Sequence, residues 1–335
     1  KLAIKSTDHE PQIFFFPGAR YSCLLQQYGP AMRNLLLELG KKHILVLTPS
    51  LEYIWKLVGF DGLKSLWQGL VAIDRLNKIA CHLRPYELHR GETARAFKRG
   101  LKLIEDGLAT DRLKANLAEI KADFKNIKVR QEDRPIIGVA GDIYTRQNYF
   151  ANNYLFERLE ALGCEVWPSP FIIEEVDFTF SRGLYETLSE GKLIHSLAYA
   201  GLNLIKERKR REVQKKLEVT NLEIKEPDFK ELVKFTTTYL NYDNNQSLFL
   251  NVARMVDFAR KGADGLINVI CFNCMLGLTS AAISSRIKSD FENLPIPTLI
   301  YGETENSSAN SRLEAFVEQV KARYRKKKLN QAVNP

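Results

Sequence analysis

Residues 265–277 read GLINVICFNCMLG, and this stretch decides how the chain is interpreted. Its apolar run ends abruptly in two cysteines, Cys271 and Cys274, and a helix-like segment starts near Leu278. That order is typical of the strand–loop–helix corner of an α/β unit, where such proteins usually bind ligands. Thiolates at such a corner can hold a metal ion or an iron–sulfur cluster, or attack a substrate.

Apolar strands alternate with helices elsewhere in the chain as well. The sequence predicts further strands at 13–16, 43–47, 136–141, 165–167 and 298–300. Uniformly apolar strands that alternate with helices predict parallel sheets covered on both faces. The predicted fold class is therefore α/β, with two Rossmann-like parallel-sheet domains and additional helical segments.

The predicted domain boundary follows a long helical region between two groups of strands. Residues 51–124 carry apolar side chains mostly at helical spacing, and Pro135 introduces the next strand. We expect a first α/β domain with a helical extension at 1–130 and a second α/β domain at 131–325. The basic residues 326–335 are expected to form a disordered tail.

Composition limits the classes of protein to consider. Hydrophobic residues make up 45% of the 335 residues and charged residues 27%, as in an ordinary globular protein. No apolar run approaches the ~20 residues of a membrane span. Five cysteines, an odd number in a large chain, argue against a secreted disulfide framework and favour the reducing cytoplasm. The chain starts without an initiator methionine, so we expect a processed protein or a fragment of a larger one.

Basic residues give the chain a formal net charge of +9, but the charge is spread out. Its densest runs, 206–211 and 323–328, are interpreted as a solvated helix face and a tail. Nucleic-acid binding is therefore not expected. If the segment 206–216 did bind nucleic acid, its affinity would fall steeply with salt.

The two corner cysteines form a C-x-x-C pair whose chemistry the residues alone leave open. Thioredoxin-like redox pairs use this spacing, a zinc site needs two further ligands, and free cysteines are often simply buried. Cys23 also follows a predicted strand end, so three cysteines from two corners would suit a four-iron cluster with one open iron site. Cys81 and Cys164 are predicted to pack in the core.

Polar side chains gather at the corner after the strand 136–141. Asp142, Tyr144, Asn148 and Asn152 lie at the strand end and the start of the next helix, where they could bind an anion or a thioester. Helix capping explains Asn152 equally well. The nearby glycines lack the G-x-G-x-x-G spacing, and no G-x-x-x-x-G-K-[ST] is present, so the chain is not itself a P-loop ATPase.

Five segments, taken together and in order, resemble those of one family. Residues 22–29 (SCLLQQYG) are similar to part of its G-P-C-R-F-G-Q-Y-G, and residues 84–93 (RPYELHRGET) to its R-P-Y-E-x-x-x-G-E-T. Residues 141–152 (GDIYTRQNYFAN) resemble its G-E-I-Y-x-R-x-N-x-F-A-N, and 261–275 (KGADGLINVICFNCM) its K-G-A-D-G-x-x-N-x-x-P-F-x-C-M. Residues 312–316 match its closing R-L-E-A-F. The family is the acyl-CoA dehydratase activase-related proteins, or CoA protein activases, related to 2-hydroxyacyl-CoA dehydratases, benzoyl-CoA reductases and double-cubane cluster proteins.

This resemblance implies an oxygen-sensitive iron–sulfur component that takes a low-potential electron from an ATP-hydrolysing activator of the acetate/sugar-kinase/actin type. ATP would act only through that separate activator. Cys23 and Cys274 would hold iron in a 4Fe-4S or double-cubane cluster. Cys271 stands where the family has proline, which makes it an additional ligand candidate. Asp142, Tyr144, Asn148 and Asn152 would shape the facing substrate pocket.

The same resemblance implies an oligomer and an N-terminal or companion family subunit, because this chain would be a C-terminal portion. Two other functions stay open. A cluster-less scaffold or interaction subunit would keep its stability and partner binding without the cysteines. A C-x-x-C thiol redox protein would have a low thiol pKa at Cys271 or Cys274 and no metal.

Overall fold

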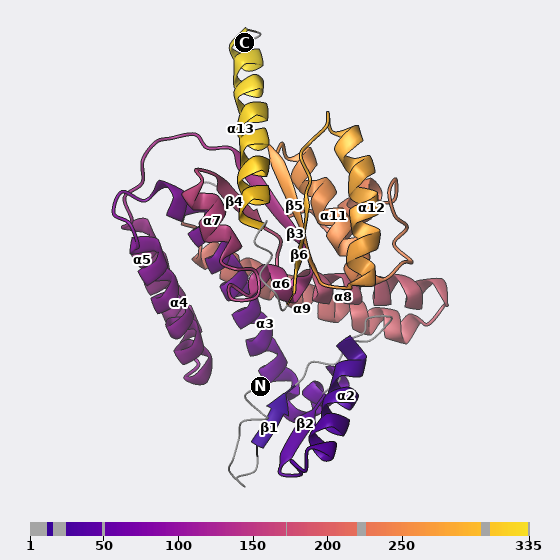
Figure 1. Ribbon diagram of the computed structural model, residues 1–335. Helices are drawn as coiled ribbons and strands as arrows, with labels where there is room; N and C mark the ends of the chain where they lie inside the picture. The colour runs from indigo at the N-terminus through magenta and orange to yellow at the C-terminus, as the bar shows by residue number, and fades with distance from the viewer. Residues whose placement is uncertain are drawn as a thin grey trace. The chain divides into compact units, whose positions relative to one another are not determined.

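The computed structural model describes residues 12–15, 25–48, 51–171, 173–219, 226–302 and 309–333 (Figure 1). Contacts between residues divide the chain into two compact units, Lys1–Ser65 and Leu66–Pro335. Both contain a small parallel sheet together with helices, so the predicted α/β class is confirmed.

The smaller unit contains one β–α–β connection, as the sequence predicts. Strands β1 (Gln12–Phe15) and β2 (Ile44–Leu47) pair in parallel, and α2 (Leu25–Glu38) connects them. Its buried core comprises Leu36, Ile44 and Val46. Cys23 lies outside the described residues, so its predicted place beyond a strand end is not tested.

The larger unit is built on a four-stranded parallel sheet of order β4-β3-β5-β6. Its strands are β3 (Ile136–Gly141), β4 (Glu165–Pro168), β5 (Gly265–Cys271) and β6 (Thr298–Tyr301). The central strands β3 and β5 are almost entirely buried, which explains why they are nearly continuous apolar runs.

Helices cover both faces of this sheet (Figure 1). On one face α7 (Leu155–Ala161) and α13 (Ala309–Val333) pack through apolar residues such as Leu159 and Phe316. On the other face lie α11 (Gln246–Arg260) and α12 (Met275–Asp290). Gly138 permits the close approach of α11, because a Cβ there would lie 2.5 Å from the ring of Phe258.

A helical layer belongs to the same unit. Helix α3 (Leu51–Leu83) is interrupted at Gly59, and its part from Leu66 onward belongs to this unit. That part leads through a 3-10 turn (Arg84–Tyr86) to the hairpin of α4 (Glu92–Ala109) and α5 (Leu113–Lys125). The remaining helices are α6 (Ile143–Gln147), α8 (Ile173–Ser189), α9 (Leu193–Lys216) and α10 (Phe229–Thr236). No helix in the described part of the chain is long and apolar enough to cross a membrane.

Buried ion pairs and hydrogen bonds join this helical layer to the sheet. Arg84 Nε donates to Glu160 Oε2 on α7 at 2.5 Å, and Tyr86 Oη donates to Glu165 Oε2 on β4 at 2.7 Å. His82 Nδ1 lies 2.9 Å from Glu165 Oε1. The boundary predicted at residues 130 and 131 therefore falls inside the larger unit, and the observed division comes at Ser65.

Helix α13 differs from its prediction at the C-terminal end. The sequence predicts a disordered tail from residue 326, whereas the helix continues to Val333. Lys327 Nζ donates to the carbonyl oxygen of Gly262 at 2.9 Å, and Lys328 Nζ lies 2.6 Å from Asp133 Oδ2. These contacts hold basic side chains against the body of the unit, so this run of charge is compatible with a helix.

Candidate functional site at the carboxyl ends of the central strands

The two polar corners meet where the chain reverses direction across the sheet. From β3 the chain continues to β4 on one side, and from β5 to β6 on the other. Parallel sheets bind ligands at such a switch point, beyond the carboxyl ends of the two central strands. Asp142 follows β3 and Cys271 ends β5, and the Asp142 backbone N–H donates to the carbonyl oxygen of Val269 at 2.7 Å.

Glycines allow this corner to close tightly. Gly141 has φ +124°, and a Cβ at this position would lie 1.9 Å from the carbonyl oxygen of Val269. A Cβ on Gly277, in the first turn of α12, would lie 2.7 Å from side-chain atoms of Ile270. Both glycines therefore permit an approach of the backbone to β5 that any larger residue would prevent.

Cys274 caps the N-terminus of α12. Its Sγ accepts a hydrogen bond from the backbone N–H of Gly277 at 3.3 Å, while Asn273, with φ +58°, makes the turn out of β5. The Cys274 N–H donates to the carbonyl oxygen of Cys271 at 3.2 Å. This short turn brings the two thiols within hydrogen-bonding reach of each other.

The two thiols differ in acidity. The hydrogen bond from Cys271 lowers the pKa of Cys274 to about 6, against the opposing effect of partial burial, and the Gly277 N–H lowers it further. The same hydrogen bond and partial burial raise the pKa of Cys271. Near neutral pH the pair therefore contains one thiolate, Cys274, and one thiol, Cys271.

Asp142 contributes a negative charge close to both sulfurs, and its charge raises the pKa of each. Its Oδ1 accepts hydrogen bonds from the N–H of Thr145 at 2.7 Å and from Thr145 Oγ1 at 2.6 Å, so it also caps α6. The structure thus brings together three of the predicted site residues: Asp142, Cys271 and Cys274.

The other predicted pocket residues differ in accessibility. The side chain of Tyr144 is 66% exposed, whereas that of Asn152 is 1% exposed. The amide of Asn152 donates to the carbonyl oxygens of Thr145 and Arg146 and accepts from the N–H of Leu155. These bonds support the capping interpretation of Asn152, because all three are made to the backbone. Asn148 likewise accepts from the N–H of Ala151 at 3.0 Å.

A complete metal site is not assembled by the residues that the structure describes. Among them, no group of three or more His, Cys, Asp or Glu side chains is arranged to hold a metal ion. Two adjacent sulfurs, one of them a thiolate, fit part of the ligand set of an iron–sulfur cluster. The three-cysteine site stays a prediction, because Cys23 lies outside those residues.

The two core cysteines were predicted correctly. Cys81 and Cys164 are both completely buried. Burial raises the pKa of Cys164 to about 11 and also raises that of Cys81. They are therefore inert packing residues, unlike the half-buried pair at the end of β5.

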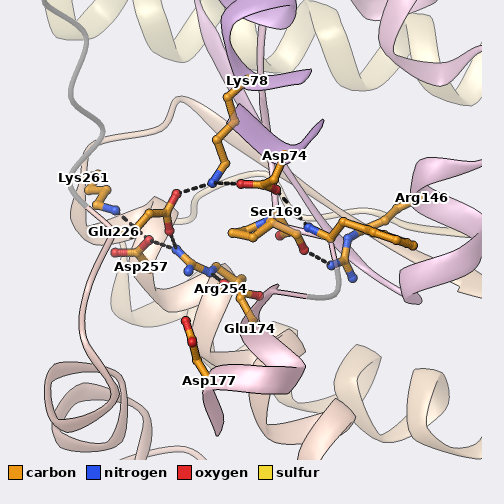
Figure 2. Close-up of polar contacts among 12 residues, drawn as sticks. Asp74, Lys78, Arg146, Ser169, Glu174, Asp177, Glu226, Arg254, Asp257 and Lys261 are labelled. Atoms are coloured by element: carbon orange, nitrogen blue, oxygen red, sulfur yellow. Dashed lines mark hydrogen bonds and ion pairs between the residues drawn. The ribbon is translucent and has the colours of Figure 1, made fainter. Parts of the chain in front are cut away.

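Sequence reasoning missed a buried group of charges beneath α11 (Figure 2). Arg254, which is 3% exposed, is ion-paired with Glu174, Glu226 and Asp257. Glu226 also pairs with Lys78 at 2.6 Å. One signal was present: Arg254 and Asp257 are charges within the otherwise apolar residues 252–259, and a charge on a buried helix face needs a partner.

Comparison with known proteins gives no match: no family model, curated protein or solved structure is similar enough to this chain to show a relationship. The geometry of the corner therefore carries the functional argument.

Proposed function

We propose that this chain is the iron–sulfur component of an ATP-dependent, low-potential reductase or dehydratase system. Its substrate would be a CoA thioester or another small molecule. The observation that supports this proposal is the thiol–thiolate pair of Cys271 and Cys274 at the switch point of a parallel sheet. The resemblance of five ordered segments to the CoA protein activases supplies the reaction class.

In this proposal Cys274 and Cys271 bind iron, and Cys23 supplies a further sulfur. The cluster, of the 4Fe-4S or double-cubane type, would accept and pass on single low-potential electrons. Cys274 is already a thiolate near neutral pH, so it binds a metal without first losing a proton. The negative charge of Asp142 beside the sulfurs would favour the oxidised state and so keep the potential low.

The surroundings of the pair suit a partner that delivers electrons at close range. Phe272 and Met275 flank the cysteines and are 69% and 61% exposed. Exposed apolar side chains at such a corner are suited to contact with another protein. We therefore place an activator of the acetate/sugar-kinase/actin type at this end of the sheet, with the chain working in the cytoplasm beside a companion subunit. In this proposal the two units, each with its own parallel sheet, would be two Rossmann-like domains.

Iron and acid-labile sulfide, measured with a visible spectrum on protein purified without oxygen, test this proposal. The wild type is expected to be brown and to contain stoichiometric iron. Cys274→Ala and Cys23→Ala should lose that iron, whereas Cys164→Ala, which removes a buried packing thiol, should keep it. A wild type without iron would overturn the proposal.

The hydrogen bond between the two thiols specifically favours a second function, dithiol–disulfide exchange. The Cys274 thiolate would attack a disulfide of a partner and displace one partner thiolate, giving a mixed disulfide. Cys271, after losing its proton, would attack Cys274 Sγ and release the second partner thiolate. The partner is thereby reduced by two electrons, and Cys271 and Cys274 become a disulfide.

Iron-free protein that cycles between the dithiol and the disulfide in a glutathione redox titration would support this function. If the iron-free protein is inert in that titration, the remaining hypothesis is the cluster-less scaffold or interaction subunit.

A further inference from the structure

A large cavity lies in the helical part of the larger unit, apart from the cysteine corner. Its volume is about 1430 Å³, and its lining residues include side chains from α3, α8, α9, α10 and α11. This volume exceeds the ~300–1,000 Å³ that is usual for small-molecule sites. Asp142, Cys271 and Cys274 do not line it, so it is a separate candidate site.

One wall of the cavity consists of charges that neutralise each other (Figure 2). Lys78 lies 2.9 Å from Asp74 and 2.6 Å from Glu226, and Glu226 also pairs with Arg254. Asp74 in addition accepts a hydrogen bond from the N–H of Phe171 at 3.0 Å. Each of these charges already has a partner of opposite charge within the protein, so this wall does not need a charged ligand.

The remaining lining charges are strongly unbalanced. Among the described residues, one lining carboxylate, Glu218, makes neither an ion pair nor a helix cap. The lining cations that form no ion pair with any residue the structure describes are Arg75, Arg211, Lys215, Lys230 and Lys234. Arg75 is only partly exposed, and among the described residues its buried Nε atom has no hydrogen-bond acceptor, so its charge is not neutralised by a neighbour.

Apolar side chains line the cavity beside these cations. Phe178, Leu232 and Leu250 lie behind the wall and are almost completely buried. The accessible apolar surface comes from Tyr185 and Leu188 of α8, which are both more than half exposed. A ligand that fits both parts needs an anionic group for Arg75 and an apolar portion for this surface.

We propose that the cavity binds an organic phosphate with an apolar portion. The phosphate oxygens would accept from Arg75, whose planar guanidinium suits two-point contact with phosphate, and from the lysines of α10. The apolar portion would lie along Tyr185 and Leu188. This site does not depend on the cysteine corner or on a cluster.

Isothermal titration of the full chain with octyl phosphate tests the proposal, with 1-octanol as the neutral ligand of the same length. Octyl phosphate is expected to bind at one site, with affinity at least about ten-fold above that of 1-octanol, because a charged hydrogen bond is lost in the alcohol. Arg75→Gln should weaken octyl phosphate at least about ten-fold and leave 1-octanol unchanged. Lys288→Gln, which removes an exposed lysine of α12 outside the cavity, is the matched control.

Three results would overturn the proposal: no binding of octyl phosphate, equal affinity for 1-octanol, or equal affinity in Arg75→Gln and wild type. Circular dichroism melting of each variant shows whether a lost affinity comes from unfolding. If Arg75→Gln unfolds, it is replaced by Lys230→Gln together with Lys234→Gln, which removes the two exposed lysines of α10 that line the cavity. Iron content should be unchanged in all these variants, so failure of this site is distinguishable from failure of the iron–sulfur proposal.

Discussion

The cysteine corner and the charge group beneath α11 are both polar sites beside the same sheet, but their groups are satisfied in opposite ways. Arg254 has carboxylates of Glu174, Glu226 and Asp257 as partners and is almost completely buried. Cys271 and Cys274 interact with each other through a hydrogen bond and are half-buried, so the Cys274 thiolate is accessible near neutral pH. A closed network of this kind stabilises the fold, whereas an open pair with shifted pKa values is a candidate for chemistry.

The largest expected effect comes from breaking the closed network. Arg254→Met leaves the buried Glu174 without a cation and removes one of two partners from Glu226 and Asp257. We expect it to lower the free energy of unfolding by about 3–5 kcal/mol. Urea denaturation followed by circular dichroism measures this change. Arg286→Met, which removes an exposed arginine of α12, should change it by less than about 0.5 kcal/mol. Equal losses in the two variants would contradict the assignment of Arg254 to a structural role.

A smaller loss is expected at the cysteine corner itself. Gly277→Ala places a Cβ 2.7 Å from Ile270, so the first turn of α12 must shift, at about 1–3 kcal/mol. Gly201→Ala is the matched control, because nothing lies within 4 Å of its Cβ. That substitution in the middle of α9 should stabilise the protein by about 0.5–1 kcal/mol. Chemical denaturation of the two variants in parallel therefore gives changes of opposite sign if the corner is as tight as described.

Much of the larger sheet could be predicted from the sequence, because its strands are fully buried and read as short apolar runs. Predicted strands at 136–141, 165–167, 265–270 and 298–300 coincide with β3, β4, β5 and β6 within about a residue or two. Strand order could not be predicted, since it depends on which apolar faces pack. The meeting of Asp142 with Cys271 follows from that order.

The domain division illustrates a second limit of prediction from the sequence. Arg84 contacts Glu160 across 76 residues of sequence, and Tyr86 contacts Glu165 across 79. Local sequence patterns do not reveal such pairs, and the boundary predicted at residues 130 and 131 separates residues that these contacts join. These contacts give the R-P-Y-E segment a structural role. Glu87, in the same segment, adds hydrogen bonds that it accepts from the N–H groups of Gly91 and Thr93.

The pH dependence of thiol reactivity tests whether Cys274 is an accessible thiolate. In metal-free protein, alkylation of Cys274 by iodoacetamide should rise with pH around a midpoint near its pKa of about 6, instead of the ~8.5 of an unperturbed thiol. Cys271→Ala removes the hydrogen bond that lowers this pKa, so the midpoint should move upward. Peptide mass mapping identifies the modified residue, and the buried Cys81 and Cys164 should stay unmodified while the protein is folded. A midpoint unchanged by Cys271→Ala would show that the two thiols do not interact.

The smallest effect is expected from the charge of Asp142. Its carboxylate disfavours the Cys274 thiolate, so Asp142→Asn should lower the alkylation midpoint, by less than about one pH unit. Asparagine keeps the oxygen that caps α6 through the N–H of Thr145, so the corner should hold its geometry and only the charge is lost. Asp133→Asn removes a carboxylate that pairs with Lys328 instead and should leave the midpoint where it is. If Asp142→Asn raised the midpoint, the loss of the cap rather than the loss of the charge would dominate. The main role of Asp142 would then be structural, like that of the Arg254 network, instead of the tuning of a reactive thiol.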